Sequence, residues 1–265
     1  MNGTHDTGTA PVGDSTTDEL AGLRMLVTGG ASGIGHAVTT AALARGAHVA
    51  VVDLDPATAP DGALRVAGDV SDDLSVSDAV QHVTATIGGL DILINNAGIG
   101  AQGNIEANPL EEWRRVFEVN VLGAVRVTRA ALPHLRRSPH AAVVNMCSIA
   151  ATAGLPDRAL YSASKGAVLS LTLALAADHL HEGIRVNCVN PGTTDTPWVG
   201  RLLDRAPDPA AERAALEARQ PSGRLVTPQE VAAAVLHLAG PSAGATTGTS
   251  LAVDGGMAGL RLRLH

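Results

Sequence analysis

The strongest constraint in the sequence is the alternation of short, β-branched apolar runs with helical stretches. From residue 23 onward, seven such runs read as strands: LRMLVTGG, HVAVVDLD, ALRVAGDV, LDILINNAG, AAVVNMCSI, IRVNCVNPG and GTSLAVDGG. Strands that alternate with helices lie parallel in one sheet, and the near-continuous apolar character of these runs is typical of strands buried on both faces. We therefore predict an α/β fold, a doubly wound parallel sheet of seven strands with helices on both faces.

The ends of the chain and one internal segment depart from this alternation. Residues 1–20 are polar, rich in Gly and Thr and without periodicity, which predicts a mobile N-terminal tail. The domain then covers residues 21–265, because no linker or repeat divides it. Within it, the segment 198–219 is helical and polar but interrupted by Pro207 and Pro209.

Composition and charge exclude several classes of protein. The net charge of −7 argues against nucleic acid as a partner, since phosphates require a basic surface. No uncharged apolar run reaches the roughly 18 residues of a membrane span, and the N-terminus does not resemble a secretory signal. Two cysteines, Cys147 and Cys188, are too few for a disulfide scaffold, so we expect a cytoplasmic protein. The ten histidines show no HExxH or HxxxH spacing, and no metal site is predicted.

A glycine-rich turn, TGGASGIG at 28–35, separates the first strand from the helix that follows it. Gly29, Gly33 and Gly35 allow a sharp turn close to a pyrophosphate, and the helix N-terminus offers unpaired N–H groups to that anion. The spacing differs from the general G-x-G-x-x-G pattern, which occurs instead as GIGAQG at 98–103, where no helix opens from the third glycine. A plain glycine-rich turn is the alternative interpretation.

An acidic residue at the end of the second strand supports the nucleotide interpretation. Asp53 lies 18 residues after Gly35, where a carboxylate can accept hydrogen bonds from the ribose hydroxyls of an adenosine. A carboxylate there repels a 2′-phosphate, and neither the turn nor Leu54 supplies an arginine. The pattern favours NAD over NADP, although an aspartate at a strand end is also common in ordinary turns.

The single tyrosine and the single lysine of the chain, Tyr161 and Lys165, form Y-x-x-x-K inside a predicted helix. Residues four apart lie on one helix face, and a nearby ammonium favours the phenolate form of a phenol. Such a group can exchange a proton with an alcohol or ketone as hydride leaves or arrives. A surface tyrosine and a solvated lysine are the alternative. The overlapping S-x-x-K pattern does not indicate a penicillin-binding enzyme, because that class requires a second lysine in K-T-G.

These features occur in a familiar order. TGGASGIG, Asp53, Asp69–Val70, NNAG at 95–98, Asn120, Ser148, YSASK at 161–165 and PG at 191–192 together resemble the short-chain dehydrogenase/reductase family over residues 22–257. The resemblance implies a single-domain Rossmann fold, NAD as the cofactor and an oxidoreductase acting on CH–OH groups. It also implies a homotetramer, because the family packs the helices carrying Asn120 and Tyr161 across two-fold axes. The C-terminal run GLRLRLH could then extend over a neighbour's site.

The resemblance also assigns roles. Tyr161 would be the acid and base, Ser148 would bind the substrate oxygen, Lys165 would hold the nicotinamide ribose and Asn120 would anchor a relay water. Taken alone, Ser148 and Asn120 fit ordinary strand-end or helix-capping roles better than these catalytic ones. Cofactor contacts are expected from Gly29, Ser32, Gly33, Ile34, Gly35, Asp53, Asp69, Val70, Asn96, Ala97, Gly98, Tyr161, Lys165, Pro191, Gly192, Thr194 and Thr196.

The segment 198–219 corresponds to the family's variable substrate flap. Its flanks, PGTTDTPWVGRLL and RQPSGRLVTPQEVA, are similar to the branch of type 2 3-hydroxybutyrate, L-fucose and 2-keto-3-deoxy-L-fuconate dehydrogenases. In the hydroxybutyrate members, arginines that match Arg158 and Arg224 hold the substrate carboxylate. Guanidinium groups bind carboxylates bidentately. We therefore expect Arg158, Arg224 and Arg201, with Ser148, to hold an acid or a polyhydroxyl chain.

Two other functions remain open at this stage. A reductase of 3-oxoacyl thioesters would share the fold and the tyrosine–lysine pair, but would usually take NADPH. A catalytically inactive family member acting as a binding protein would belong to a different class, and the intact set of Ser148, Tyr161 and Lys165 argues against it.

Overall fold

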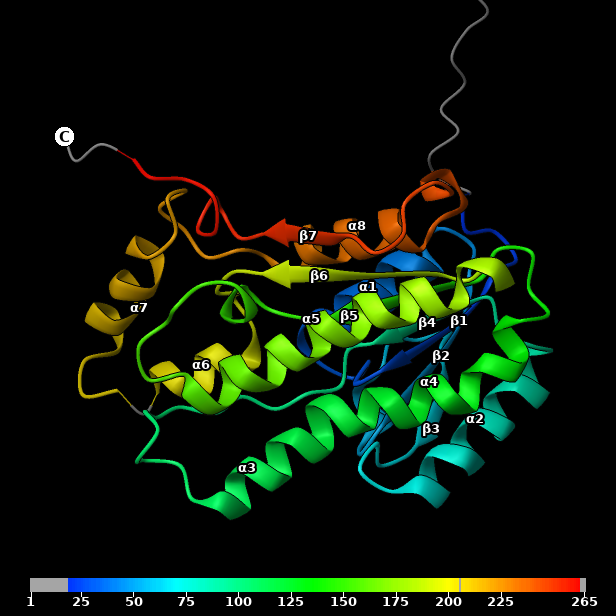
Figure 1. The fold of residues 1–265 in the computed structure, drawn as a ribbon, viewed down its shortest axis with the longest axis horizontal. Coiled ribbons are helices and arrows are strands. Elements are labelled where there is room, and N and C mark those ends of the chain that lie inside the picture. Colours follow the sequence, from blue (N-terminus) through cyan, green and yellow to red (C-terminus); the bar gives the residue numbers. More distant parts are fainter. Residues whose placement is uncertain (1–18, 205, 263–265) are drawn as a thin grey trace, which may run out of the picture.

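The predicted sheet is present, with seven strands that are all parallel (Figure 1). The computed structural model describes residues 19–204 and 206–262. The strand order is β3-β2-β1-β4-β5-β6-β7, so the direction of winding reverses between β1 and β4. Open α/β sheets bind ligands beyond the carboxyl ends of the strands at such a reversal. The strands are β1 (Arg24–Thr28), β2 (His48–Asp53), β3 (Leu64–Ala67), β4 (Ile92–Asn95), β5 (Ala142–Met146), β6 (Arg185–Pro191) and β7 (Ser250–Val253).

Helices cover both faces of this sheet, as predicted. Helices α1 and α8 pack against each other on one face, and α2, α4 and α5 cover the other. The helices are α1 (Gly33–Leu43), α2 (Asp73–Ile87), α3 (Leu110–Phe117), α4 (Gly123–Leu135), α5 (Ala159–His179), α6 (Pro197–Leu203), α7 (Pro209–Ala218) and α8 (Pro228–Ala239).

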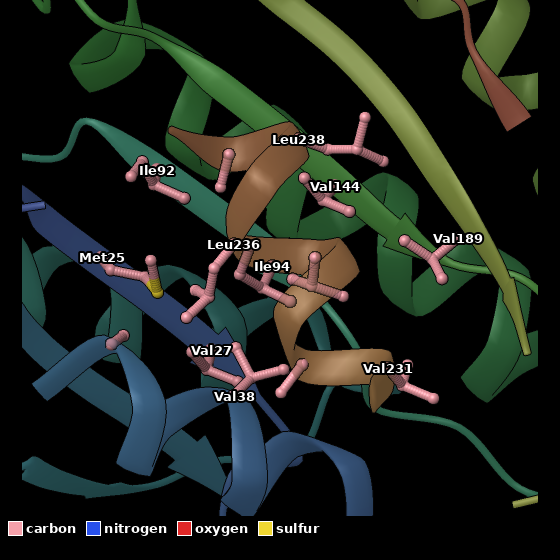
Figure 2. Packing of buried hydrophobic residues seen from close by; sticks show 14 of the residues in the cluster. Met25, Val27, Val38, Ile92, Ile94, Val144, Val189, Val231, Leu236 and Leu238 are labelled. Carbon is pink, nitrogen blue, oxygen red and sulfur yellow. The ribbon is translucent and has the colours of Figure 1, made fainter. Parts of the chain in front are cut away.

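The core consists of two apolar layers separated by the sheet. Successive strand residues point to opposite faces, so Met25 and Val27 of β1 face α8 while Leu26 faces the α2–α4 side. Figure 2 shows the first layer, in which Val231 and Leu236 of α8 lie against residues from β1, β4 and β5. Burial of apolar area in the two layers fixes the strand positions and therefore the edge at which their carboxyl ends meet.

The folded domain begins earlier in the chain than predicted. Leu20 is completely buried in the first core layer, and the carboxylate of Glu19 accepts a hydrogen bond from the backbone N–H of Ser242 at 2.9 Å. These two residues therefore belong to the domain and not to a tail. The remainder of the predicted tail, residues 1–18, lies outside the described residues, as do the last three residues of the run GLRLRLH.

One helical stretch of the described residues, Ala159–Glu182, is long and apolar enough to cross a membrane by length and composition alone. It begins with α5, which packs against β6 in the second core layer. The segment also carries Tyr161 and Lys165. Its apolar side chains include those of the helix face that packs on the sheet.

Candidate active site

A cavity of about 780 Å³ opens at the carboxyl ends of the strands. In Figure 1 the arrowheads of β6 and β7 point toward this end of the sheet, where α6 and α7 lie. The predicted site residues that line the cavity are Gly29, Ser32, Gly33, Ile34, Asp53, Asp69, Val70, Asn96, Ala97, Gly98, Ser148, Arg158, Tyr161, Lys165, Pro191, Gly192, Thr194, Thr196 and Arg201. Among the described residues, the predicted Gly35, Asn120 and Arg224 do not line it.

The glycine-rich turn has the geometry of an anion cradle. Gly29 and Gly33 have φ angles of +64° and +53°, in the left-handed region that glycine adopts without strain. Ser32 precedes α1, and within the described chain its side chain makes no capping hydrogen bond and the first turn of α1 carries no acidic residue. The N–H groups of this helix start are therefore available to a phosphate.

Gly35 has a packing role instead of a direct place in the cavity. A Cβ atom at this position would lie 2.2 Å from the carbonyl oxygen of Gly29 and 2.4 Å from Nδ2 of Asn96. The absence of a side chain thus allows α1 to approach the turn. Asn96 fixes the same contact, because its Nδ2 donates to the carbonyl oxygens of Thr28 and Gly29 at 3.0 and 2.9 Å.

Two aspartates that the sequence predicts as cofactor contacts, Asp53 and Asp69, line the cavity. Asp53 accepts hydrogen bonds from the backbone N–H groups of Ala31 at 3.1 Å and Asp55 at 3.3 Å, so its carboxylate is held beside the glycine-rich turn. Asp69 accepts from both the hydroxyl and the backbone N–H of Ser71, and these bonds lower the pKa of its carboxyl group. Both side chains are thereby oriented before any ligand binds.

The end of β6 and the start of the flap contribute the remaining predicted cofactor residues. Thr194 is buried and its hydroxyl donates to the carbonyl oxygen of Gly192 at 3.2 Å. The hydroxyl of Thr196 caps the start of α6 by accepting from the N–H of Val199. Thr196 also lies against the glycine-rich turn, since a Cβ on Gly33 would be 3.6 Å from its Cγ2. The flap is therefore attached next to the phosphate cradle.

The predicted catalytic pair lies on one face of α5 at the cavity. Lys165 is 5% exposed, its Nζ lies 5.8 Å from the centroid of the Tyr161 ring, and it donates to the carbonyl oxygen of Met146 at 2.8 Å. Ser148 follows β5, and its Oγ accepts from the N–H of Ala150 at 3.1 Å. Because the hydroxyl is the acceptor in that bond, its proton remains able to donate to a substrate oxygen.

Asn120 does not line the cavity but is hydrogen-bonded to segments next to it. A π-helical turn at Glu118–Leu122 connects α3 to α4, and such turns are frequent near functional sites. Asn120 is 3% exposed, accepts from the N–H of Ile99 at 2.8 Å and donates to Ile99 O and Ser164 Oγ at 2.9 and 3.1 Å. Ser164 in turn donates to the carbonyl oxygen of Tyr161 at 2.8 Å. Asn120 therefore joins the β4 loop to the helix that carries Tyr161.

Arginines from several elements reach the substrate end of the cavity. Arg158 directly precedes α5, and Arg219 directly follows α7; both line the cavity, as do Arg201 and Arg115. Burial, and next the neighbouring Arg219, lowers the pKa of Arg158. Among the ion pairs of the described residues, none includes any of these four arginines. Sequence reasoning missed Arg219 and Arg115, and nothing in their local pattern distinguishes them from other surface arginines.

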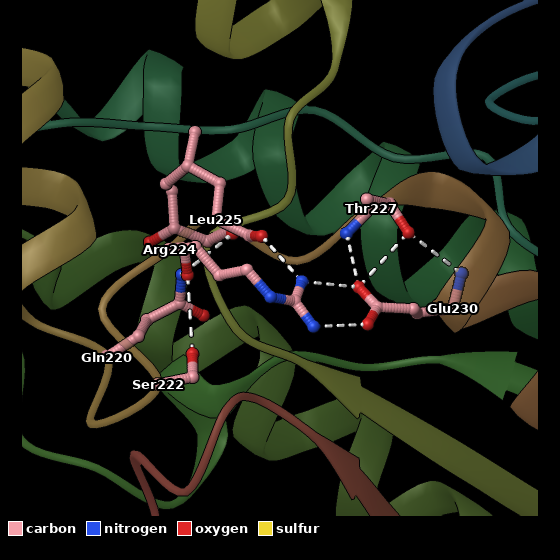
Figure 3. Close-up of polar contacts among 7 residues, drawn as sticks. Gln220, Ser222, Arg224, Leu225, Thr227 and Glu230 are labelled. Carbon is pink, nitrogen blue, oxygen red and sulfur yellow. Dashed lines mark hydrogen bonds and ion pairs between the residues drawn. The ribbon is translucent and has the colours of Figure 1, made fainter.

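Arg224 has a different environment from the one predicted. Figure 3 shows its guanidinium group facing the carboxylate of Glu230, with two hydrogen bonds of 2.9 and 2.6 Å and a third bond of 3.1 Å to the carbonyl oxygen of Leu225. Glu230 and Thr227 also form the capping box that begins α8. The structure therefore places Arg224 in a helix-start ion pair and does not bring it together with Arg158.

Outside the cavity, the described residues contain no group of three or more His, Cys, Asp or Glu side chains that could hold a metal ion. Both cysteines of the chain lie in the described part, where they are free and buried next to each other in an apolar cluster with Val168.

Comparison with known proteins agrees with this arrangement. A family model described as enoyl-(acyl carrier protein) reductase matches residues 29–258. The chain is 38% identical over 244 residues to 2-(S)-hydroxypropyl-CoM dehydrogenase 3 of Xanthobacter autotrophicus, covering 87% of this chain and 94% of that protein. It is 34% identical over 252 residues to 2-keto-3-deoxy-L-fuconate dehydrogenase of Xanthomonas campestris, covering 94% and 84%.

A solved structure shares the fold. The ligand-free aldohexose dehydrogenase of Thermoplasma acidophilum superposes with a TM-score of 0.88 and 31% identity, over 94% of this chain and 98% of that one. The fold and the site define a Rossmann-type oxidoreductase. The chain belongs to the short-chain dehydrogenase/reductase family, as its motifs predicted, and is an oxidoreductase that acts on CH–OH groups.

Proposed function

We propose that the protein is an NAD-dependent enzyme that interconverts a secondary alcohol and a ketone on a small substrate carrying an acid group or a polyhydroxyl chain. The observation that carries this proposal is the meeting of Ser148, Tyr161 and Lys165 in one cavity with the phosphate cradle and Asp53. Proton transfer and cofactor binding would then take place in one cavity at the end of the sheet.

The residues present fit a nicotinamide dinucleotide. Gly29, Gly33 and the start of α1 would hold the pyrophosphate, and Asp53 would accept from the adenosine ribose. A 2′-phosphate would be repelled by the Asp53 carboxylate, which supports NAD over NADP. Lys165 would bind the nicotinamide ribose, and Thr194 and Thr196, which line the cavity, would meet the nicotinamide carboxamide and the phosphates.

Each catalytic side chain then has a defined task. The nicotinamide ring, when bound, accepts or supplies the hydride. The deprotonated oxygen of Tyr161 would take a proton from the alcohol during oxidation, and the resulting hydroxyl would return it to the substrate oxygen during reduction. Ser148 would donate to the substrate oxygen, and the Nζ of the buried Lys165 lies 5.8 Å from the centroid of the Tyr161 ring.

The acid substrate is supported by the arginines. Burial, and next the positive charge of Arg219, lowers the pKa of Arg158, so the two cations repel each other at the cavity wall. An anion placed between them would relieve that repulsion and could form bidentate hydrogen bonds. One relative acts on 2-keto-3-deoxy-L-fuconate, an acid, so the substrate class has a precedent at 34% identity.

An absorbance assay at 340 nm tests the proposal. NAD⁺ and NADP⁺ would each be offered with a panel of hydroxy acids, sugar acids, sugars and neutral secondary alcohols, and NADH and NADPH with the matching ketones. We expect turnover with NAD⁺ on the acids or sugars and with NADH on the matching ketones. Preference for NADPH and a 3-oxoacyl thioester would instead establish the thioester reductase, and cofactor binding without turnover on any substrate would support a non-catalytic binding protein.

We also propose a cytoplasmic homotetramer. Leu173 on α5 is 50% exposed and Leu122, at the end of the π-helical turn, is 43% exposed, so the α4–α5 side presents apolar side chains to solvent. Pairing of two copies through these helices would bury them. Two free cysteines fit a reducing compartment. Light scattering at micromolar concentration should give four times the chain mass, and a monomer would refute the assembly.

A further inference from the structure

The GIGAQG segment at 98–103 is not the predicted phosphate-binding turn, but one of its glycines, Gly100, lies against Trp198. The backbone of Gly100 does not have the positive φ angle that would require glycine. A Cβ atom at Gly100 would, however, lie 2.6 Å from Cζ2 and 2.9 Å from Cε2 of Trp198. The six-membered ring of the indole therefore rests directly on the glycine backbone. Any side chain at position 100 would push the ring away.

The indole is carried by a well-anchored helix. Trp198 is the second residue of α6, which starts at Pro197 and is capped by Thr196. On the opposite side of this short helix, Val199 and Leu203 are buried in an apolar cluster with Leu216 of α7 and Leu225. Trp198 itself is 41% exposed. The position of the indole is thus set by the buried residues of α6 and by the contact with Gly100.

Trp198 also borders two cavities. Besides the cavity above Tyr161, a second one of about 510 Å³ lies beside it, and Gly100, Ala101, Trp198, Arg201 and Leu202 line both. The far side of the second cavity is polar, with Gln102, Glu112 and Glu212. The Gly100–Trp198 contact therefore runs along the shared wall between the two spaces.

We propose that Trp198, seated on Gly100, is a partition that closes the substrate cavity toward the second cavity and so limits the length of substrate that can reach Tyr161. This inference rests on the proposed function and adds a specificity-determining residue to it. It assigns to the enzyme compact substrates, whose chain on either side of the reacting carbon stops short of the indole.

The contact between the Trp198 indole and Gly100 can be tested by fluorescence, without an activity measurement. The chain has two tryptophans, Trp113 and Trp198, so a Trp113→Phe background leaves Trp198 as the sole indole fluorophore. Gly100→Ala in this background should raise the quenching of Trp198 by iodide and shift its emission to longer wavelength. Gly200→Ala is the matched control on α6 itself, because a Cβ there meets no atom within 4 Å. That control should leave quenching unchanged.

The partition is tested by chain length. Methyl ketones from four to ten carbons, reduced with NADH, give a ratio of kcat/KM for the longest to the shortest member. Trp198→Ala should raise this ratio by about tenfold or more, since several methylene groups gain the space that the indole fills in the wild type. Trp198→Phe and Gly100→Ala should raise it less, and Gly200→Ala should leave it at the wild-type value. Thermal unfolding of each variant verifies that it is folded.

Each outcome decides a separate point. Unchanged quenching in Gly100→Ala would show that the indole is not seated on the glycine. An unchanged chain-length ratio in folded Trp198→Ala would show that the indole does not separate the two cavities. Either result overturns the partition. Absence of turnover by the wild type on every ketone and every substrate of the panel would overturn the proposed function instead, while the quenching result would still decide on the seat.

Discussion

The two ends of the cavity are constructed differently. At the cofactor end, side chains are fixed by bonds to backbone groups of neighbouring strands and turns: Asn96 holds the carbonyl oxygens of Thr28 and Gly29, and Asp53 is held by the N–H of Ala31. At the substrate end, the walls are α6 and α7, which an apolar cluster and surface ion pairs such as Arg213–Asp195 attach to the domain.

This difference separates what is constant from what can vary. The cofactor end depends on the sheet itself, because its residues lie at strand ends whose register the core determines. The substrate end depends on individual side chains such as Arg158, Arg219 and Trp198, which can change without disturbing the sheet. We therefore expect substitutions at the two ends to give different kinetic effects, and the following experiments compare them.

The largest effect should come from the group placed between the two ends. Tyr161→Phe keeps the ring and removes the hydroxyl, so it should lower kcat by about 10²-fold or more, the usual size of a general acid–base contribution. The affinity for NADH, measured by fluorescence titration, should change little. A variant that retains near-wild-type turnover would dispose of the proposed chemistry.

Lys165→Ala is the companion to this test. The ammonium group lies near Tyr161 and also lines the cofactor cavity, so its loss should weaken both kcat and NADH binding. A Lys165→Ala variant that lost turnover but bound NADH normally would separate the lysine from the cofactor end.

The next effect belongs to the substrate end. Arg158→Ala should lower kcat/KM on the preferred acid by about 30-fold or more, because truncating one arm of a charged clamp leaves the remaining charge unpaired. Arg219→Ala and Arg201→Ala should act in the same direction but more weakly, since both residues are exposed whereas Arg158 is half-buried. Neutral alcohols should be turned over as before. Equal losses of kcat/KM on acids and on neutral alcohols would mean that the arginines do not bind the acid group of the substrate.

The same division explains what the sequence could predict. The sheet, the helices and the cofactor residues follow from periodicity and from glycine and aspartate at strand ends, which are local signals. The prediction that Arg224 binds the substrate was wrong. Its partner Glu230 is six residues away, and the sequence does not distinguish an exposed arginine in a capping network from an arginine that binds a substrate. Arg219 and Trp198 were missed as partners of Arg158 and Gly100, because these contacts join segments more than fifty residues apart.

At the cofactor end, Asp53→Ala should have a moderate effect. Loss of a charged hydrogen bond to the ribose, about 1.5–3 kcal/mol, should weaken NADH binding by about tenfold or more. Removing the negative charge should at the same time improve NADPH binding, so the ratio of the two dissociation constants moves toward one. The ratio is measured by titration without substrate. A wild-type enzyme that already prefers NADPH would contradict the role of Asp53.

The smallest effect should distinguish Arg224 from Arg158. Glu230 pairs with Arg224 and accepts from the backbone N–H of Thr227, and these bonds, Arg224 first, lower the pKa of Glu230 from 4.5 to about 2. A carboxyl whose pKa is depressed in the folded state stabilises the fold above pH 4.5 and loses that contribution as the pH falls toward about 2.

Arg224→Ala should therefore leave kcat/KM on acids at the wild-type value and lower stability slightly. The side chains of Arg224 and Glu230 are 57% and 41% exposed, so solvent screens the pair and its loss should cost little stability. Glu230→Gln keeps the capping geometry and removes the charge, so it should show the same small loss at neutral pH in urea unfolding. For both variants the difference from wild type should shrink as the pH falls from 4.5 toward 2, because the wild-type carboxylate is then protonated as well. A loss of acid turnover in Arg224→Ala as large as that in Arg158→Ala would instead place this arginine at the substrate.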